Sequence, residues 1–354
     1  MAAAHGFWAE AWRRYRRRPL ALAALGFVVL LLAVAAFAPL IAGTKPVLCR
    51  YKGRLYAPCL GYFDRRLEPA VFAKDRFRGT YPRNLAAKDP QSWAVWPLFF
   101  QDPYRTVRAD EWPGRPENPS GDQGVPSWAH PFGTDQAGVD VLAKMVHGTT
   151  VALLVGFVSM GIAGSIGIIV GALGGYFGGG IDALVGRITE VVMCIPALVL
   201  ILAIVAIIEK PTIWHTMAII GFTGWTGIAR LTRGEFLRLK GAEYVTAARA
   251  AGAGPFRIIV RHVLPNALAP ILVPITFGIA AAILVESGLS FLGFGAPPPS
   301  ASWGSILNGA RSNLGMWWLV VFPGAAIFLT VLAYNLVGEG LQEATDPRLR
   351  EARK

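Results

Sequence analysis

Six long apolar runs dominate this chain and decide what it can fold into. Most of them reach the roughly 20 residues that a helix needs to cross the core of a bilayer. With 54% hydrophobic and 16% charged residues, the 354-residue chain is too apolar for a soluble protein. No barrel-type alternation is present, so each span is expected to be a helix. The sequence predicts an all-α integral membrane protein with six transmembrane helices, at residues 20–41, 149–177, 188–208, 213–228, 267–289 and 317–337.

Basic residues predict the orientation, because cytoplasmic flanks of membrane spans carry an excess of Lys and Arg. The N-terminal tail, 1–18, holds five arginines against one acid, Glu10, so both termini of a six-span chain are expected in the cytoplasm. The net charge of +12 is therefore interpreted as a topology signal, since no basic-aromatic motif of a nucleic-acid-binding protein accompanies it. The predicted inner segments are 1–18, 178–187, 230–264 and 339–354, and the outer ones are 42–146, 209–212 and 290–316.

The first apolar run, within 19–41, could alternatively be a cleaved signal peptide. It is long, and no convincing small-x-small cleavage site precedes the polar region that follows. We therefore expect it to be retained as the first transmembrane helix.

The segment 42–146 is expected to be a large exoplasmic insert. It contains Cys49 and Cys59, which could form a disulfide in an oxidising compartment and remove roughly 3 kcal/mol of chain freedom from the unfolded state. Two free thiols are the main alternative, and a metal site lacks a supporting His/Cys cluster. Residues 86–127 are rich in Pro, Gly, Asp and Asn, which predicts loops with little regular structure.

Two features surround the second span. Upstream, Val139, Leu142 and Val146 lie near one face of a predicted short amphipathic helix, as a helix on the membrane surface would need. Within and after the span, glycines recur from Gly161 to Gly178, which favours close packing with a neighbouring helix over a flexible gating element. Proline lies inside three of the spans, where it can kink the helix, at Pro196, Pro274 and Pro323.

Motifs of catalytic chemistry are absent from the sequence. No lysine follows a glycine as a P-loop requires, no GxSxG elbow occurs, and the five histidines lack ligand spacing. Of the few acids at or within spans, Glu190 lies three residues from Arg187 and is expected to pair with it. Glu286, near the outer end of the fifth span, is a candidate for the substrate pathway because burial of its charge is costly.

A cytoplasmic stretch rich in small residues, 243–270, separates the fourth and fifth spans. Its alanines and glycines offer a low-relief surface surrounded by Arg249, Arg257 and Arg261, which suits the close approach of another protein. The stretch TAARAAGAGPFRIIVRHVLP resembles the EAA loop of binding-protein-dependent ABC importer permeases, within a predicted loop at 239–265. The matching residues are Ala247, Ala248, Gly252, Leu264 and Pro265, whereas Thr246 replaces the family's Glu and His262 its Ile.

The resemblance extends over most of the chain. EYV-x-AAR around Glu243 and Tyr244 is similar to the dipeptide/oligopeptide subgroup, as are HPFGTDQAGVDVLAKMVHGT before the second span and LSFLGFGAPPPSASWGSILNGAR before the last. GEGLQEATDPRLR resembles the family's C-terminal motif, and KPVLCRYKGRLYAPCLGYF resembles an insert in a longer subset of peptide permeases.

The resemblance implies one half of a heterodimeric pathway in the inner membrane of a bacterium. A second permease, two ATP-binding subunits and an exoplasmic peptide-binding protein would be the partners, with ATP and Mg²⁺ bound to the ATPase subunits and no cofactor on this chain. The helix beginning at Glu243 and Tyr244 would dock on an ATPase. Nickel complexes or other small solutes are alternative cargoes. A secondary transporter or channel would instead need inverted repeats or several intramembrane charges, and a membrane enzyme would need a reactive cluster.

Overall fold

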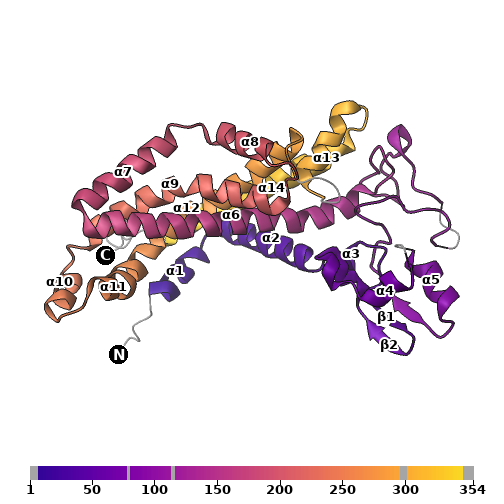
Figure 1. The fold of residues 1–354 in the computed structure, drawn as a ribbon, viewed down its shortest axis with the longest axis horizontal. Helices are drawn as coiled ribbons and strands as arrows, with labels where there is room; N and C mark the ends of the chain where they lie inside the picture. The colour runs from indigo at the N-terminus through magenta and orange to yellow at the C-terminus, as the bar shows by residue number, and fades with distance from the viewer. Residues whose placement is uncertain (1–6, 78–79, 113–115, 296–300, 346–354) are drawn as a thin grey trace. The chain divides into compact units, whose positions relative to one another are not determined.

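The computed structural model describes residues 7–77, 80–112, 116–295 and 301–345. These residues are mostly helical and separate into two compact units (Figure 1). The first unit comprises Met1–Val29, Leu154–Glu286 and Leu329–Lys354, and the second comprises Leu30–Leu153 and Ser287–Phe328. The long helices α2, α6, α12 and α14 contribute to both units.

The first unit is built from helices alone. Its members, in chain order, are α1 (Phe7–Tyr15), the beginning of α2 (Pro19–Ala36), most of α6 (Val141–Phe177), α7 (Gly179–Met193), α8 (Ala197–Ile207), α9 (Ile213–Leu239), α10 (Glu243–Ala250), α11 (Pro255–Arg257), the π-helical turn η4 (Ile258–Val263), most of α12 (Leu264–Phe291) and the end of α14 (Trp318–Thr345).

Four helices of the described chain are long and apolar enough to cross a membrane, namely α2, α6, α14 and the continuous Pro255–Phe291 segment that ends as α12. Taken together as one bent span, α7 and α8 make a fifth. The predicted fourth span lies in α9, whose first half is enriched in Gly, Thr and Trp and whose second half carries four charged residues. This composition makes α9 less apolar than the others.

The predicted third span, 188–208, is bent at Pro196, one of the prolines expected to kink a span. The chain bends by 78° between α7 and α8, at a break that contains Ile195 and Pro196. Proline has no N–H to continue the helical hydrogen bonds, and it disfavours helical backbone at the residue before it. In contrast, Pro274 and Pro323 lie inside the unbroken helices α12 and α14.

The glycines of the second span pack α6 against α9, as the sequence favoured. A Cβ atom at Gly171 would lie 2.4 Å from the Ala229 carbonyl oxygen, and one at Gly175 would lie 2.6 Å from that of Arg233. One at Gly167 would lie 2.7 Å from the Cβ of Ile228 and 2.9 Å from the Trp225 carbonyl oxygen. Only glycine allows the two backbones to approach this closely. The contacts advance along both chains together, so α6 and α9 run parallel, side by side (Figure 1).

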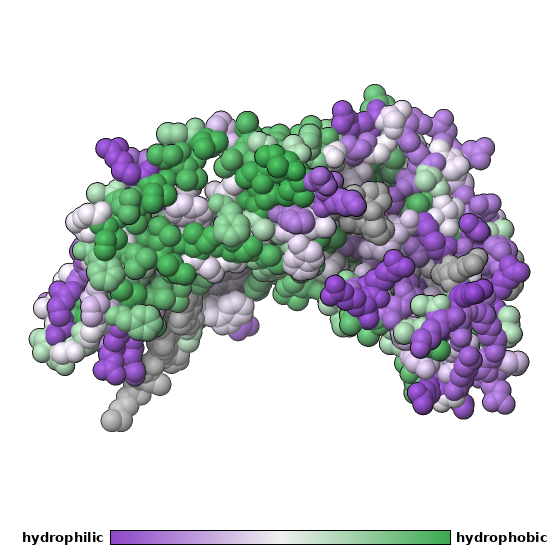
Figure 2. Space-filling view, in the orientation of Figure 1, coloured by the Kyte–Doolittle hydropathy of each residue, from purple (hydrophilic) through white to green (hydrophobic). Residues whose placement is uncertain are grey.

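Helix α12 runs antiparallel to α6. Gly156 of α6 contacts Ile279, whereas Gly164, two turns later on α6, contacts Ile275, earlier on α12. The outward surface of the first unit is largely hydrophobic in the view of Figure 2. On α7 and α8, for example, Leu184 and Val199 are each at least 60% exposed. Such a surface suits lipid or neighbouring transmembrane helices rather than water.

The second unit combines the remaining helix ends with a small mixed subdomain. It contains α3 (Ala38–Ile41), β1 (Leu48–Tyr51), β2 (Arg54–Tyr56), the 3₁₀ turns η1 (Pro58–Tyr62) and η2 (Arg65–Leu67), α4 (Ala70–Lys74), α5 (Tyr81–Lys88), β3 (Trp93–Val95), η3 (Gly121–Gln123), α13 (Trp303–Gly309) and η5 (Ala310–Ser312). The strands form an antiparallel sheet in the order β2-β1-β3. The chain is therefore not all-α. Of the segment 86–127 that was predicted to be irregular, the end of α5 and β3 are regular, whereas the described residues 96–112 and 116–127 are largely irregular.

The sheet exists because its inner face covers an aromatic core. Tyr51 of β1 packs with Phe72 and Phe77 at ring separations of 5.6 and 5.3 Å, and Tyr81 packs on Phe72 at 5.1 Å. These four rings are almost fully buried. The three strands are only three or four residues long. Their alternation of side chains was therefore too short a pattern to identify strands in a sequence rich in Pro and Gly.

The segment before the second span is not a separate surface helix. Helix α6 begins at Val141 and continues without a break to Phe177. Val146 is buried with Ala38, Ala42 and Ala143 rather than exposed to a membrane surface. The apolar face that the sequence indicated therefore packs inside the protein.

Two motifs that the sequence analysis singled out meet in the second unit. Trp303 Nε1 donates to the Met145 carbonyl at 3.1 Å, and Trp318 Nε1 donates to that of Thr134 at 2.9 Å. The Gln136 amide donates to Ser312 Oγ at 2.6 Å. Trp303 lies within the second motif, whereas Ser312 and Trp318 follow its end at Arg311. The bonds therefore join the residues before the second span to the second motif and to the start of the last span. Part of the second motif, 296–300, and the end of the C-terminal motif, 346–350, lie outside the described residues.

Candidate functional site

The predicted docking segment forms a distinct exposed helix, α10, between α9 and α12. Glu243, Tyr244, Thr246 and Ala247 are exposed, and Ala248 is half-buried. Its buried residue is Val245, which has no exposed surface, and α10 contacts η4. One side of α10 is therefore anchored and the remaining surface is free in this chain.

Gly252 ends this helix. Its φ of +82° is the left-handed conformation that side chains other than glycine rarely adopt. The Gly252 N–H donates to the Arg249 carbonyl at 3.0 Å, and the Ala253 N–H donates to that of Ala248 at 3.0 Å. This pair of bonds is a Schellman motif, which satisfies the last helical carbonyls and stops the helix. The family-matching glycine thus has a defined conformational role at the end of α10.

Leu264 and Pro265 mark the start of α12. The preceding turn, η4, is π-helical and ends where Pro265 supplies no N–H to the turn before it. Ile258 and Val263 of η4 are buried, Leu264 is half-buried and Pro265 is exposed. Because α10 packs on η4, and η4 continues into α12, a force on α10 reaches α12 through packed residues and continuous backbone.

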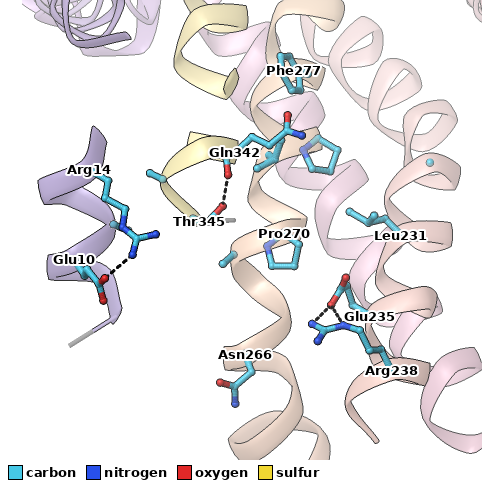
Figure 3. Close-up of a pocket in the computed structure, with 16 residues that line it drawn as sticks. Glu10, Arg14, Leu231, Glu235, Arg238, Asn266, Pro270, Phe277, Gln342 and Thr345 are labelled. Carbon is cyan, nitrogen blue, oxygen red and sulfur yellow. Dashed lines mark hydrogen bonds and ion pairs between the residues drawn. The ribbon is translucent and has the colours of Figure 1, made fainter. Parts of the chain in front are cut away.

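A cavity of about 870 Å³ opens at the end of the first unit where α1 lies (Figure 3). Its walls come from α1, α9, α12 and α14. Glu10 and Arg14 of α1 form an ion pair at 2.5 Å, and Glu235 and Arg238 of α9 form another at 2.6 Å. Figure 3 shows these two pairs on either side of α12.

Helix α12 presents an apolar wall to this cavity. It contributes Ala269, Pro270, Val273, Pro274 and Phe277, and Asn266 lies at the N-terminal end of this row. Pro274 is one of the prolines expected to kink a span, and Pro270 lies one turn before it in the same helix. The spacing of two prolines four residues apart in an apolar run could have drawn attention to this face, since both lie on one side of a helix.

The intramembrane acids have different environments. Glu190 pairs with Arg187 at 3.2 Å, as predicted, and both side chains are largely exposed. Asp182 receives two hydrogen bonds from Arg233, one of them at 2.7 Å, which joins α7 to α9. Glu286 is only 1% exposed, so it faces no open vestibule in this structure, and its place in a substrate pathway stays a prediction.

The two cysteines of the insert are free, so the structure differs from the disulfide expectation and agrees with the alternative of two thiols. Cys49 lies on the buried face of β1 within the aromatic core, and Cys59 Sγ donates to the Val47 carbonyl at 3.5 Å. Burial raises the pKa of both thiols, that of Cys49 to about 11. Both are therefore poor nucleophiles at neutral pH.

Comparison with known proteins gives matches over most of the chain. Residues 165–351 match the family model described as "Binding-protein-dependent transport system inner membrane component", and residues 6–54 match "N-terminal TM domain of oligopeptide transport permease C". A putative peptide permease protein of Brucella suis is 42% identical over 63% of this chain and 75% of its own length. The dipeptide transport system permease protein DppC of Bacillus subtilis is 42% identical over 64% of this chain and 71% of its own length. A solved structure of the MetNI methionine ABC transporter, in an inward facing conformation, is 21% identical, with a TM-score of 0.43, covering 56% of this chain and 97% of that chain.

Proposed function

Because the chain belongs to the family of binding-protein-dependent transport system inner membrane components, we propose that it is the permease subunit of an ABC importer for dipeptides or oligopeptides. The cargo assignment rests on the names of relatives such as the dipeptide transport system permease protein DppC of Bacillus subtilis. Nickel complexes and other small solutes are the alternative cargoes for the same machinery.

The exposed helix α10 is the observation that carries the proposal. A helix with one buried anchor, Val245, and a free surface of small residues is suited to enter a groove on a soluble subunit. The ATP-binding sites then lie on two such subunits, with their Mg²⁺, and this chain supplies no ATPase site. Glu243, Tyr244, Thr246, Ala247 and Ala248 would form the contact, and Gly252 would keep α10 short and rigid.

Coupling follows from the connections of α10. Closure of the ATPase subunits around ATP would displace α10, and the displacement would pass through η4 to α12. Nucleotide and substrate then bias one two-state equilibrium of the bundle, which is the thermodynamic requirement for coupling. Leu264 and Pro265 lie at the joint between η4 and α12, where they would transmit this movement.

The helix directions support the six-span topology of the proposal. α6 runs parallel to α9 and antiparallel to α12. Successive spans cross the membrane in opposite directions, so spans two and four must run parallel and spans two and five antiparallel. Contacts of Gly340 on α14 with Ala21 on α2 also fit the first and last spans, which must run in opposite directions. With the N-terminus inside, the insert 42–146 would face an exoplasmic peptide-binding protein, in the inner membrane of a bacterium.

The proposal includes a second permease as the other half of the pathway. The exposed apolar surface of the first unit offers room for helices of such a partner as well as for lipid (Figure 2).

Reconstitution tests the function. Proteoliposomes holding this chain, its partner permease and the two ATPase subunits should take up a labelled dipeptide only with ATP and the binding protein. A benzoylphenylalanine placed at the exposed Tyr244 should cross-link to an ATPase subunit, whereas the same residue at Phe222, which is exposed on α9, should not. Uptake that persists at full rate without the ATPase subunits would favour a secondary transporter or channel and would refute the proposal.

A further inference from the structure

We propose that the cavity between α1, α9, α12 and α14 is an inner binding site for the transported peptide, which it holds by both charged termini and by its backbone. This inference rests on the proposed function and adds a location and a recognition chemistry to it. The volume of about 870 Å³ falls within the roughly 300–1,000 Å³ of small-ligand sites.

The charges on the walls match a zwitterion. A short peptide carries an ammonium at one end and a carboxylate at the other, with no net charge from its termini. The cavity offers one acid and one base on α1, Glu10 and Arg14, and one acid and one base on α9, Glu235 and Arg238. Either terminus can therefore meet an opposite charge on either side of α12 (Figure 3). A cavity with walls of one sign would retain only one end of the peptide.

The backbone of α12 supplies acceptors between these pairs. Pro270 and Pro274 have no N–H, so the carbonyls of Asn266 and Pro270 lose the donors that a regular helix would give them. All three residues line the cavity. Freed carbonyls inside a membrane protein are tolerated where they border a polar or water-filled space. Here they can accept hydrogen bonds from the N–H groups of a peptide, whatever its side chains.

The remaining wall is apolar and unspecific. Leu231, Val273 and Phe277 can contact side chains of many sizes without a hydrogen-bond requirement. Recognition by termini and backbone, with apolar contacts elsewhere, would admit peptides of varied sequence. A lipid headgroup is the competing occupant, and it would use the same charges without needing an ammonium terminus.

A photoreactive peptide tests the location. The complete transporter in proteoliposomes would be supplied with the tripeptide Ala–benzoylphenylalanine–Ala and illuminated during ATP-driven uptake. Mass spectrometry should find the label on α9 between Gly227 and Arg238 or on α12 between Asn266 and Phe277. Acetylating the N-terminus and amidating the C-terminus of the peptide removes both of its charges. The labelling should then fall about tenfold, which is the smallest loss of affinity expected when charge-assisted hydrogen bonds are lost.

Matched variants test the residues. Glu235→Gln with Arg238→Gln should lower the labelling about tenfold, whereas Arg187→Gln with Glu190→Gln removes a pair of the same spacing on α7 and should not change it. Gly227→Trp should fill the cavity and slow uptake, because a Cβ there meets nothing within 4 Å. Gly186→Trp, equally open but on α7 and away from the cavity, is its control.

The outcomes separate this inference from the proposed function. Wild-type uptake with no label on α9 or α12, or labelling that is equal for the blocked and free tripeptides, would overturn the cavity assignment and leave the importer function standing. Absence of ATP-driven tripeptide or dipeptide uptake by the complete wild-type assembly would instead refute the proposed function itself.

Discussion

Replacing Gly252 with alanine should uncouple α10 from transport without disturbing membrane insertion. At a φ of +82°, an L-residue costs roughly 1–2 kcal/mol more than glycine. No steric clash adds to this, because a Cβ at Gly252 meets nothing within 4 Å. The strain acts on the Schellman motif, so relieving it unwinds the last turn of α10 and breaks the two hydrogen bonds that Gly252 and Ala253 donate.

The size of the effect follows from that strain. If the folded end of α10 is required for docking, about 1–2 kcal/mol reduces the competent population up to about 5- to 30-fold. The assay is ATP-driven dipeptide uptake in proteoliposomes, normalised to the amount of inserted protein. Gly252→Asn should reduce uptake less than Gly252→Ala does, because asparagine tolerates the left-handed conformation better than alanine.

A neighbouring glycine provides the control. Gly254 has a φ of −69°, which any residue adopts, and a Cβ there also meets nothing within 4 Å. Gly254→Ala should therefore keep normal uptake. If Gly252→Ala and Gly254→Ala transport equally well, the role assigned to the end of α10 is refuted.

Three further predictions concern stability and reactivity. Gly171→Ala should force α6 away from a carbonyl of α9 and cost about 1–3 kcal/mol, whereas Gly161→Ala, with nothing within 4 Å, should be neutral; equal thermal unfolding of the two variants would contradict the packing. Val245→Ala should speed hydrogen exchange in α10 while leaving α9 protected, because it removes the buried anchor of α10. Cys49, with its pKa near 11, should react about 100-fold more slowly with maleimide at pH 8 than a thiol of ordinary pKa near 9. Cys59, whose pKa is also raised, should react slowly too. Rapid labelling of either thiol in the folded protein, or a mass that shows the two bridged, would contradict the free, buried thiols.

Local patterns predicted the elements that depend on composition and short spacing. The apolar runs located the helices α2, α6, α12 and α14, and the small residues after Glu243 located α10 to within two residues of its end at Ala250. The glycines of α6 predicted close packing because their spacing alone places them on one face. The ion pair of Glu190 with Arg187 was predictable for the same reason.

Features that depend on distant parts of the chain were out of reach. The cavity needs α1, α9, α12 and α14 in one place, and no local spacing reports that association. The bond between Asp182 and Arg233 joins residues 51 positions apart. Val245 gave a weak signal as an aliphatic residue larger than alanine among Ala, Thr and Arg, yet only the folded chain shows that it is buried.

The glycine contact between α6 and α9 has a consequence for how the protein changes shape. At this contact α6 contributes glycine backbone, and α9 contributes backbone carbonyls and the Cβ atoms of Ile228, Thr232 and Phe236, which a change of rotamer does not move. Sliding one helix past the other would therefore require the helices to separate first. We therefore expect α6 and α9 to move as one rigid body during a transport cycle. The bending has to occur elsewhere, at the break before Pro196 and in the proline-containing stretch of α12, where the backbone already lacks hydrogen bonds that would resist it.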